Sequence, residues 1–179
     1  MNLYNRINQK KNRSVMMNKL DMLAIKMTEY DAGDAGRIQH FIKVHSFVRL
    51  IGIGENISEQ ELFVLEAAAL THDIGIKKAN ELYGRCDGLL QEQLGPDIAR
   101  EMLSELCFEE SEIERICYLI GHHHTYDNID GADYQILVEA DFLVNLYEGG
   151  KGAEAIKSAY NKIFKTKTGK ELCRLMFSV

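Results

Sequence analysis

Apolar residues recur every three or four positions along most of the chain, which is the spacing that places them on one face of an α-helix. No hairpin dipeptide lies between alternating apolar and polar runs, and proline occurs only once. The pattern therefore predicts an all-α chain. The predicted helices cover residues 15–30, 37–50, 62–70, 96–105, 111 to about 122, 134–147, 153–164 and 170–177.

Serine–glutamate pairs predict where two of these helices begin. Ser58 with Glu61, and Ser111 with Glu114, have the three-residue spacing of a capping box, and each pair precedes an apolar run. In such a box each side chain bonds the backbone N–H of the other residue. Both helices are therefore expected to begin just after the serine.

Glycine and proline predict several helix boundaries. Gly52 and Gly54 are expected to end the helix that begins at residue 37. Pro96 suits the first turn of the helix predicted for residues 96–105. The intervening residues 76–94 are polar and are expected to form an irregular loop with at most one short helix. Residues 1–14 are expected to form a polar tail.

The length of 179 residues suits one domain, here residues 15–179, and the net charge of −6 argues against a nucleic-acid partner. No apolar run is long enough to span a membrane, and the polar tail lacks the apolar core of a secretion signal. The four cysteines form no CxxC pair, so they are interpreted as reduced thiols in a cytoplasmic protein. Exposed helical faces leave a homodimer open.

The pair His72–Asp73 stands at the end of the Ala-rich apolar run 67–70. Two good metal ligands beside a core are costly to desolvate unless something compensates them, and a bound cation would do so. Gly75 is expected to let the chain turn sharply after the pair, so that both side chains reach one point.

Two further ligand-type residues interrupt apolar helical faces. His40 shares a face with Val44 and Val48, and Asp141 lies within a strongly apolar helix. Taken singly, His40 suits a hydrogen-bonded core histidine, and Asp141 suits a carboxylate paired with a lysine or arginine. Four such residues on separate inward faces favour one metal site instead.

The order His40, then His72–Asp73, then Asp141 resembles the H…HD…D signature of the HD-domain metal-dependent phosphohydrolases, over residues of about 37–148. The resemblance implies an all-α HD helical bundle in which these four side chains bind a divalent cation. It also implies hydrolysis of a phosphomonoester or phosphodiester of a small molecule, often a nucleotide, with Asp73 and His72 as catalytic residues.

Two imidazoles and two carboxylates suit one Mn²⁺, Fe²⁺, Co²⁺, Ni²⁺ or Zn²⁺ ion better than Ca²⁺ or Mg²⁺. Larger HD subgroups that bind two metals carry a further histidine and an HH element, which His122–His123 resembles. Gln91 stands roughly where the further histidine would be, so a single ion is expected. Glu92 could replace that histidine, which leaves a second metal near Glu92, His122 and His123 open.

Several other residues are candidates for contact with the phosphorylated substrate. Arg37 shares the face of His40 and could bind a phosphate or form a salt bridge. Lys77, His122 and His123 could also bind phosphate. Alternatively, Lys77 could be a solvated loop residue, and the histidines could occur there because a helix C-terminus favours histidine through its dipole. His45 lies too far around its helix from His40 to share an ion and is expected to be structural.

Two other functions compete with the phosphohydrolase. Some HD-fold proteins are di-iron oxygenases, which need six metal ligands. This chain has Gln91 roughly where one of those histidine ligands would stand. A non-catalytic module that binds a nucleotide or regulates a partner would use the metal as a structural clip, and it would have no need for all four ligands.

Overall fold

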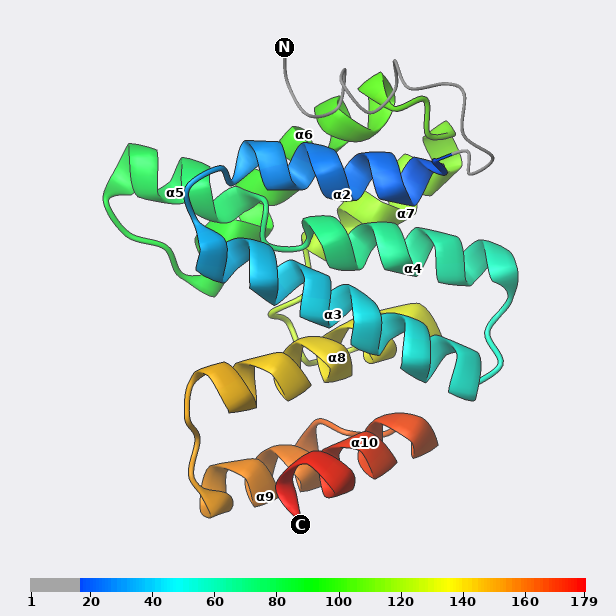
Figure 1. Cartoon of the computed structure of the whole chain (residues 1–179), viewed down its shortest axis with the longest axis vertical. Helices are drawn as coiled ribbons and strands as arrows, with labels where there is room; N and C mark the ends of the chain where they lie inside the picture. The colour runs from blue at the N-terminus through cyan, green and yellow to red at the C-terminus, as the bar shows by residue number, and fades with distance from the viewer. Residues whose placement is uncertain (1–16) are drawn as a thin grey trace.

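Helices make up the regular structure of residues 17–179, the part of the chain that the computed structural model describes (Figure 1). No strand occurs among these residues, which confirms the predicted all-α class. The tail predicted for residues 1–14 lies outside them, as do the first two residues of the helix predicted from residue 15. The helices are α2 (Lys19–Tyr30), α3 (Ala35–Gly54), α4 (Glu59–Thr71), α5 (Gly75–Tyr83), α6 (Gly88–Glu105), α7 (Glu110–Ile120), α8 (Ala132–Glu148), α9 (Ala153–Lys162) and α10 (Lys167–Phe177).

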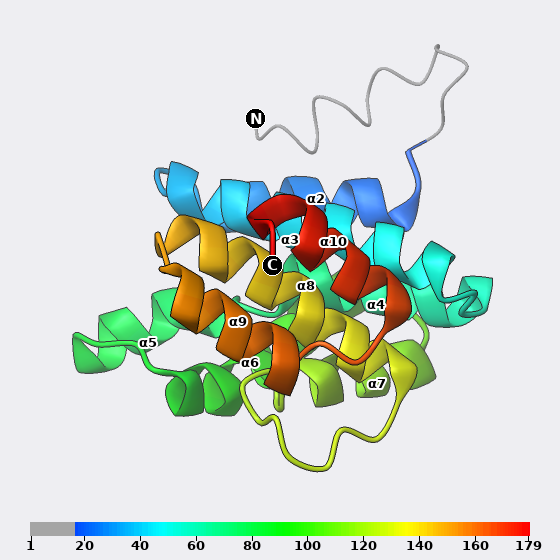
Figure 2. The same cartoon turned by 90° about the horizontal axis from the view of Figure 1, so that it is seen from below.

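Helix α4 is central, with α2, α3, α7 and α8 packed around it. Its alanines 67–69 are completely buried, and a helix that is apolar on all sides is one that other helices enclose. Figure 1 shows α8 between α3 and the α9–α10 pair, and Figure 2 shows α9 and α10 covering α8 from below. Helix α4 therefore carries His72 and Asp73 from the core to the junction with α3 and α8.

Three further predictions concern the cysteines, membrane spans and the buried face of α3. All four cysteines are free thiols. Within residues 17–179, no helix combines the length and the hydropathy that crossing a membrane requires. The apolar face predicted to carry Val44 and Val48 is confirmed, because both residues are buried in the core, together with Phe41 and Ile51 of the same helix.

One predicted capping box is confirmed and the other is wrong. At the start of α4, the Ser58 N–H donates to Glu61 Oε2 (3.0 Å) and the Glu61 N–H donates to Ser58 Oγ (3.2 Å). Helix α7 begins two residues earlier than Ser111 predicts, because the N–H of Glu109 donates to Oε2 of Glu112 (2.9 Å). Acidic side chains in a first helical turn also interact favourably with the helix dipole, so the earlier start prevails.

The prediction for residues 76–94 is right in one respect, since α5 is the one short helix that it allowed, and wrong in another, since α6 already begins at Gly88. Gly84 ends α5 with a φ of 63°, which glycine adopts without strain. Asp87 then caps α6 by accepting the N–H of Leu90 (3.1 Å). Pro96 consequently lies inside α6 and not in a first turn. Packing of α6 on α5 and α7 compensates for the hydrogen bond that proline cannot make.

Two glycines expected at boundaries serve close packing instead. Helix α3 continues through Gly52 to Gly54, and a Cβ on Gly52 would lie 2.8 Å from Cδ1 of Leu62. Gly75 does not make a sharp turn but begins α5. A Cβ there would lie 2.8 Å from the backbone oxygen of Gln91, so glycine allows α5 and α6 to meet.

Candidate metal centre

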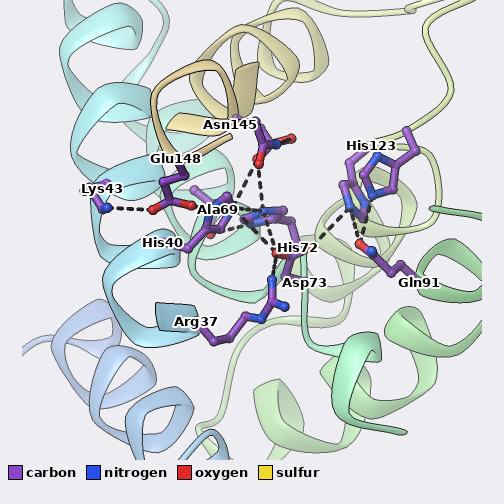
Figure 3. A network of polar contacts seen from close by, with 12 residues as sticks. Arg37, His40, Lys43, Ala69, His72, Asp73, Gln91, His123, Asn145 and Glu148 are labelled. Atoms are coloured by element: carbon purple, nitrogen blue, oxygen red, sulfur yellow. Dashed lines mark hydrogen bonds and ion pairs between the residues drawn. The ribbon is translucent and has the colours of Figure 1, made fainter. Parts of the chain in front are cut away.

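Ligand-type side chains from three parts of the fold gather in one place: His40, His72 and Asp73, labelled in Figure 3, have ligand atoms within 4.8 Å of one another, and Asp141 lies against both histidines. His40 comes from α3, His72 and Asp73 follow α4, and Asp141 comes from α8. The Nε2 atoms of the two histidines are 3.2 Å apart. Asp141 Oδ1 lies 3.1 Å from the His40 nitrogen and 3.5 Å from the His72 nitrogen, and Asp73 Oδ2 lies 3.6 Å from each.

These separations suit the coordination shell of one cation. Neighbouring ligand atoms about 2.0–2.2 Å from a shared transition-metal ion are about 2.8–3.6 Å from one another at octahedral (about 90°) or tetrahedral angles. When both Nε2 atoms carry no hydrogen, Asp141 Oδ1 is buried and has no hydrogen-bond donor. A buried oxygen in this state is destabilising unless an ion compensates it. The donor set and its geometry therefore fit a divalent metal.

Hydrogen bonds on the far side of each ring orient both histidines. His72 Nδ1 lies 2.9 Å from the carbonyl oxygen of Ala69, and His40 Nδ1 lies 2.9 Å from Oε2 of Glu148. Because these oxygens only accept, each Nδ1 must carry the hydrogen. In the neutral ring each Nε2 therefore presents a lone pair to the centre, as a metal ligand requires.

The metal-free centre holds protons where the cation would bind. Burial alone lowers the pKa of His40, but interaction with Asp141 and Asp73 outweighs it and raises the pKa to about 9. The pKa of His72 is also raised, since the same two carboxylates overcome its complete burial. Burial favours a higher pKa for Asp141, yet its contacts with the two imidazoles hold that pKa well below its usual range. The two ionised carboxylates thus hold the positive charge of two imidazoliums, and a cation that binds here would displace those protons.

Arg37 and Asn145 contact the two carboxylates from the solvent side. Arg37 Nη1 lies 2.6 Å from Asp73 Oδ2, and Asn145 Nδ2 donates to Asp141 Oδ2 (2.8 Å). Arg37 is thereby placed beside the centre, where a guanidinium can bind a phosphate oxygen.

A second group of potential ligands lies on the other side of Asp73. Its Oδ1 is 3.7 Å from Nε2 of His123, and Asp73, His123 and His124 place ligand atoms within 4.8 Å of one another. Gln91 Oε1 lies 3.3 Å from His123 Nε2 and 2.8 Å from His124 Nε2, so one amide oxygen contacts the Nε2 atoms of both rings. Burial and the neighbouring His123 lower the pKa of His124 to about 4, which leaves its ring neutral.

The carboxylate of Glu92 does not point to the ligand atoms of this second group. Its Oε1 accepts the backbone N–H of His124 (2.9 Å) and the hydroxyl of Thr125 (3.0 Å). The carboxylate therefore anchors the turn after α7.

The remaining sequence candidates lie elsewhere. Lys77 donates to the backbone oxygen of Tyr30 and lies over its ring, and His122 donates to the oxygen of Tyr118 and stacks on that ring. The structure does not bring either side chain to the four ligands. His45 Nε2 lies 3.0 Å from Glu66 Oε1. This contact is not part of the ligand cluster.

Two cavities adjoin the centre. A cavity of about 240 Å³ opens beside Asp73 and Asp141, and one of about 480 Å³ lies against His40. Arg37 and Asn145 line both of them, so both cavities reach the ligand cluster. The smaller cavity is also lined by Ile76, Asn80, Cys86, Gln91 and His124, and the larger by Asp34, Gly36, Gln39, Lys43 and Glu148.

Sequence reasoning missed Asn145 and Glu148, although the sequence contains a signal for both. They follow Asp141 by four and seven residues, which places all three on one face of α8. It also assigned no role in the site to Ile76, Cys86 or His124, which line the smaller cavity.

Comparison with known proteins agrees with this geometry. The family model described as HD domain matches residues 37–163, which include all four ligand candidates. Searches of curated proteins and of solved structures found no match.

Proposed function

This chain belongs to the HD domain family, whose members are generally metal-dependent hydrolases, and on that premise we propose that it is a divalent-metal-dependent phosphohydrolase. The substrate would be a phosphate ester of a small molecule, and nucleotides are the first class to test. The observation that carries the proposal is the cluster of His40, His72 and Asp73, with Asp141 against both histidines and Arg37 beside Asp73.

His40, His72, Asp73 and Asp141 would hold one Mn²⁺, Fe²⁺, Co²⁺, Ni²⁺ or Zn²⁺ ion. When bound, such an ion supplies a lower pKa for a water molecule and stabilises charge on the phosphoryl group. The carboxylates alone would repel a phosphate.

The side chains around the four ligands would position the reactants. Arg37 would bind a non-bridging phosphate oxygen, which holds the phosphorus close to the water. Asp73 Oδ1, the oxygen that does not face Arg37, would accept a hydrogen bond from that water and orient its lone pair. The Asn145 amide keeps the Asp141 carboxylate aligned. The cavity beside Asp73 would take the leaving group.

The test is an activity panel on the full chain loaded with Mn²⁺, Co²⁺ or Ni²⁺. The panel contains p-nitrophenyl phosphate, bis-p-nitrophenyl phosphate and nucleoside monophosphates, and phosphate or nitrophenol release is measured. Asp73→Ala should abolish turnover and metal uptake together, whereas Asp97→Ala on the exposed face of α6 should change neither. Full metal-dependent activity in Asp73→Ala contradicts the proposal. Thermal stabilisation by panel members without any turnover would favour a binding module.

A two-metal oxygenase is the second candidate, because Asp73, His123 and His124 form a group that could hold another ion. Gln91 argues for one ion, since its amide oxygen contacts the Nε2 atoms of both imidazoles and an amide is a poor transition-metal ligand. Elemental analysis separates these functions. About one metal per chain supports the phosphohydrolase, and about two irons per chain with oxygen consumption supports the oxygenase.

A further inference from the structure

The histidines at and around the metal centre differ in what orients them. Nδ1 of His72, His122 and His123 lies 2.9, 2.7 and 2.7 Å from backbone carbonyl oxygens, respectively. Nδ1 of His40 lies instead 2.9 Å from the side-chain oxygen Oε2 of Glu148. A helix holds its own carbonyls in place, whereas a carboxylate on a flexible side chain needs further contacts to stay in one orientation.

Lys43 supplies that further contact. Its Nζ lies 2.6 Å from Oε1 of Glu148, so each carboxylate oxygen of Glu148 has its own partner on α3 (Figure 3). Lys43 follows His40 by three residues and shares its helical face. Glu148 is the last residue of α8, one face of which also carries Asp141. The Glu148 carboxylate therefore ties together the two helices that contribute His40 and Asp141.

We propose that Glu148 is a positioning residue of the metal centre, which fixes the ring plane and tautomer of His40 so that Nε2 presents its lone pair to the cation. Lys43 holds the carboxylate in the orientation that this requires. The proposal rests on the metal site of the proposed function and extends it to a residue that would not touch the metal. Carboxylate partners of this kind orient metal-bound histidines and increase their basicity, and removing one costs about 10- to 100-fold in metal affinity.

The test is a Co²⁺ titration of the metal-free full chain, followed by visible absorption, which reports the geometry of the bound ion. Glu148→Ala removes the acceptor and should weaken Co²⁺ binding about 10- to 100-fold and alter the spectrum. Glu148→Gln keeps an oxygen that can accept the Nδ1 hydrogen but lacks the charge, so its affinity should lie between those of Glu148→Ala and the wild type. Glu101→Ala, an exposed glutamate on α6, is the matched control and should bind as the wild type does.

The outcomes separate this inference from the proposed function. Glu148→Ala with an affinity within about twofold of the wild type and an unchanged spectrum overturns the positioning role, and so does an equal loss in Glu101→Ala. If thermal unfolding shows that Glu148→Ala does not fold, Glu148→Gln decides by the same twofold criterion. A wild type that binds no Co²⁺ overturns both proposals. A wild type that binds Co²⁺ but hydrolyses no ester contradicts the proposed function alone.

Discussion

Arg37 and Asp73 form an ion pair at the centre, with Nη1 of the arginine 2.6 Å from Oδ2 of the aspartate. Asp73 Oδ2 is also the oxygen that faces the Nε2 atoms of His40 and His72. In the proposed function, the guanidinium would therefore lie within reach of a phosphate oxygen at the metal site. The shared oxygen Asp73 Oδ2 would then connect substrate binding to the ligand cluster.

Replacing Arg37 by glutamine should lower kcat/KM for a phosphate ester about 10- to 100-fold, because one charge-assisted hydrogen bond is worth about 1.5–3 kcal/mol. Steady-state kinetics on the best substrate of the panel measures this change. Arg174→Gln on α10, far from the centre in sequence and exposed, should leave kcat/KM unaltered. Equal kcat/KM in Arg37→Gln and the wild type would contradict the phosphate-binding role.

Metal binding should stabilise the folded protein, and Asp141→Asn should remove that effect. At an ion concentration of about 100 times Kd, binding adds about 2.7 kcal/mol to the free energy of unfolding. For a chain of this size the expected rise in Tm is about 5–11 °C. Differential scanning calorimetry with Mn²⁺ and then EDTA measures the rise and its reversal.

Asp97→Asn should keep the full metal-induced rise in Tm, since its side chain is exposed on α6. A rise of equal size in Asp141→Asn would show that the ion binds elsewhere.

Asp31 should make the protein less stable as the pH rises. Burial raises the pKa of its carboxyl to about 6, although Arg37 acts in the opposite direction. A carboxyl with a folded pKa above its unfolded value of 3.8 contributes stability below pH 3.8, and that contribution is lost as the pH rises through 6. Asp31→Asn removes the titration, so the variant should be more stable than the wild type at pH 7–8, by at most about 3 kcal/mol.

Urea unfolding of Asp31→Asn and the wild type at several pH values from 4 to 8 checks this sign. The stability difference should grow between pH 4 and pH 6 and then stay constant. A difference independent of pH would mean that Asp31 acts through packing and not through its charge.

Glu139 should be essential for the stability of the C-terminal helices. Its carboxylate is completely buried and accepts the backbone N–H of Thr166 (2.9 Å), the backbone N–H of Lys165 and the amide of Gln135 (2.8 Å). Glu139→Ala would leave the two backbone N–H donors without this acceptor, at up to about 1–3 kcal/mol each, whereas the Gln135 amide keeps its bond to the Ile163 oxygen. The midpoint of urea unfolding measures the loss.

The control for Glu139 is the exposed Glu101→Ala, whose midpoint should change little. A small change in Glu139→Ala would show that water replaces the carboxylate.

The sequence by itself determined the helical class and the four ligand candidates. Helical periodicity is a local property, so the buried face of α3 and the completely buried run in α4 could be predicted from spacing alone. His40, His72, Asp73 and Asp141 stand out because polar residues that interrupt apolar faces need a partner. The capping box at Ser58 was equally local.

Tertiary structure decided what depends on residues far apart in the chain. Pro96 lies inside α6, and Gly75 begins a helix, because α5 and α6 pack together closely enough to compensate for weak local preferences. The partners of Arg37 and His40 lie 36 and 108 residues away, at Asp73 and Glu148. Helical spacing indicates which face a side chain occupies, but only the packing of α3 against α4 and α8 determines which side chains meet there.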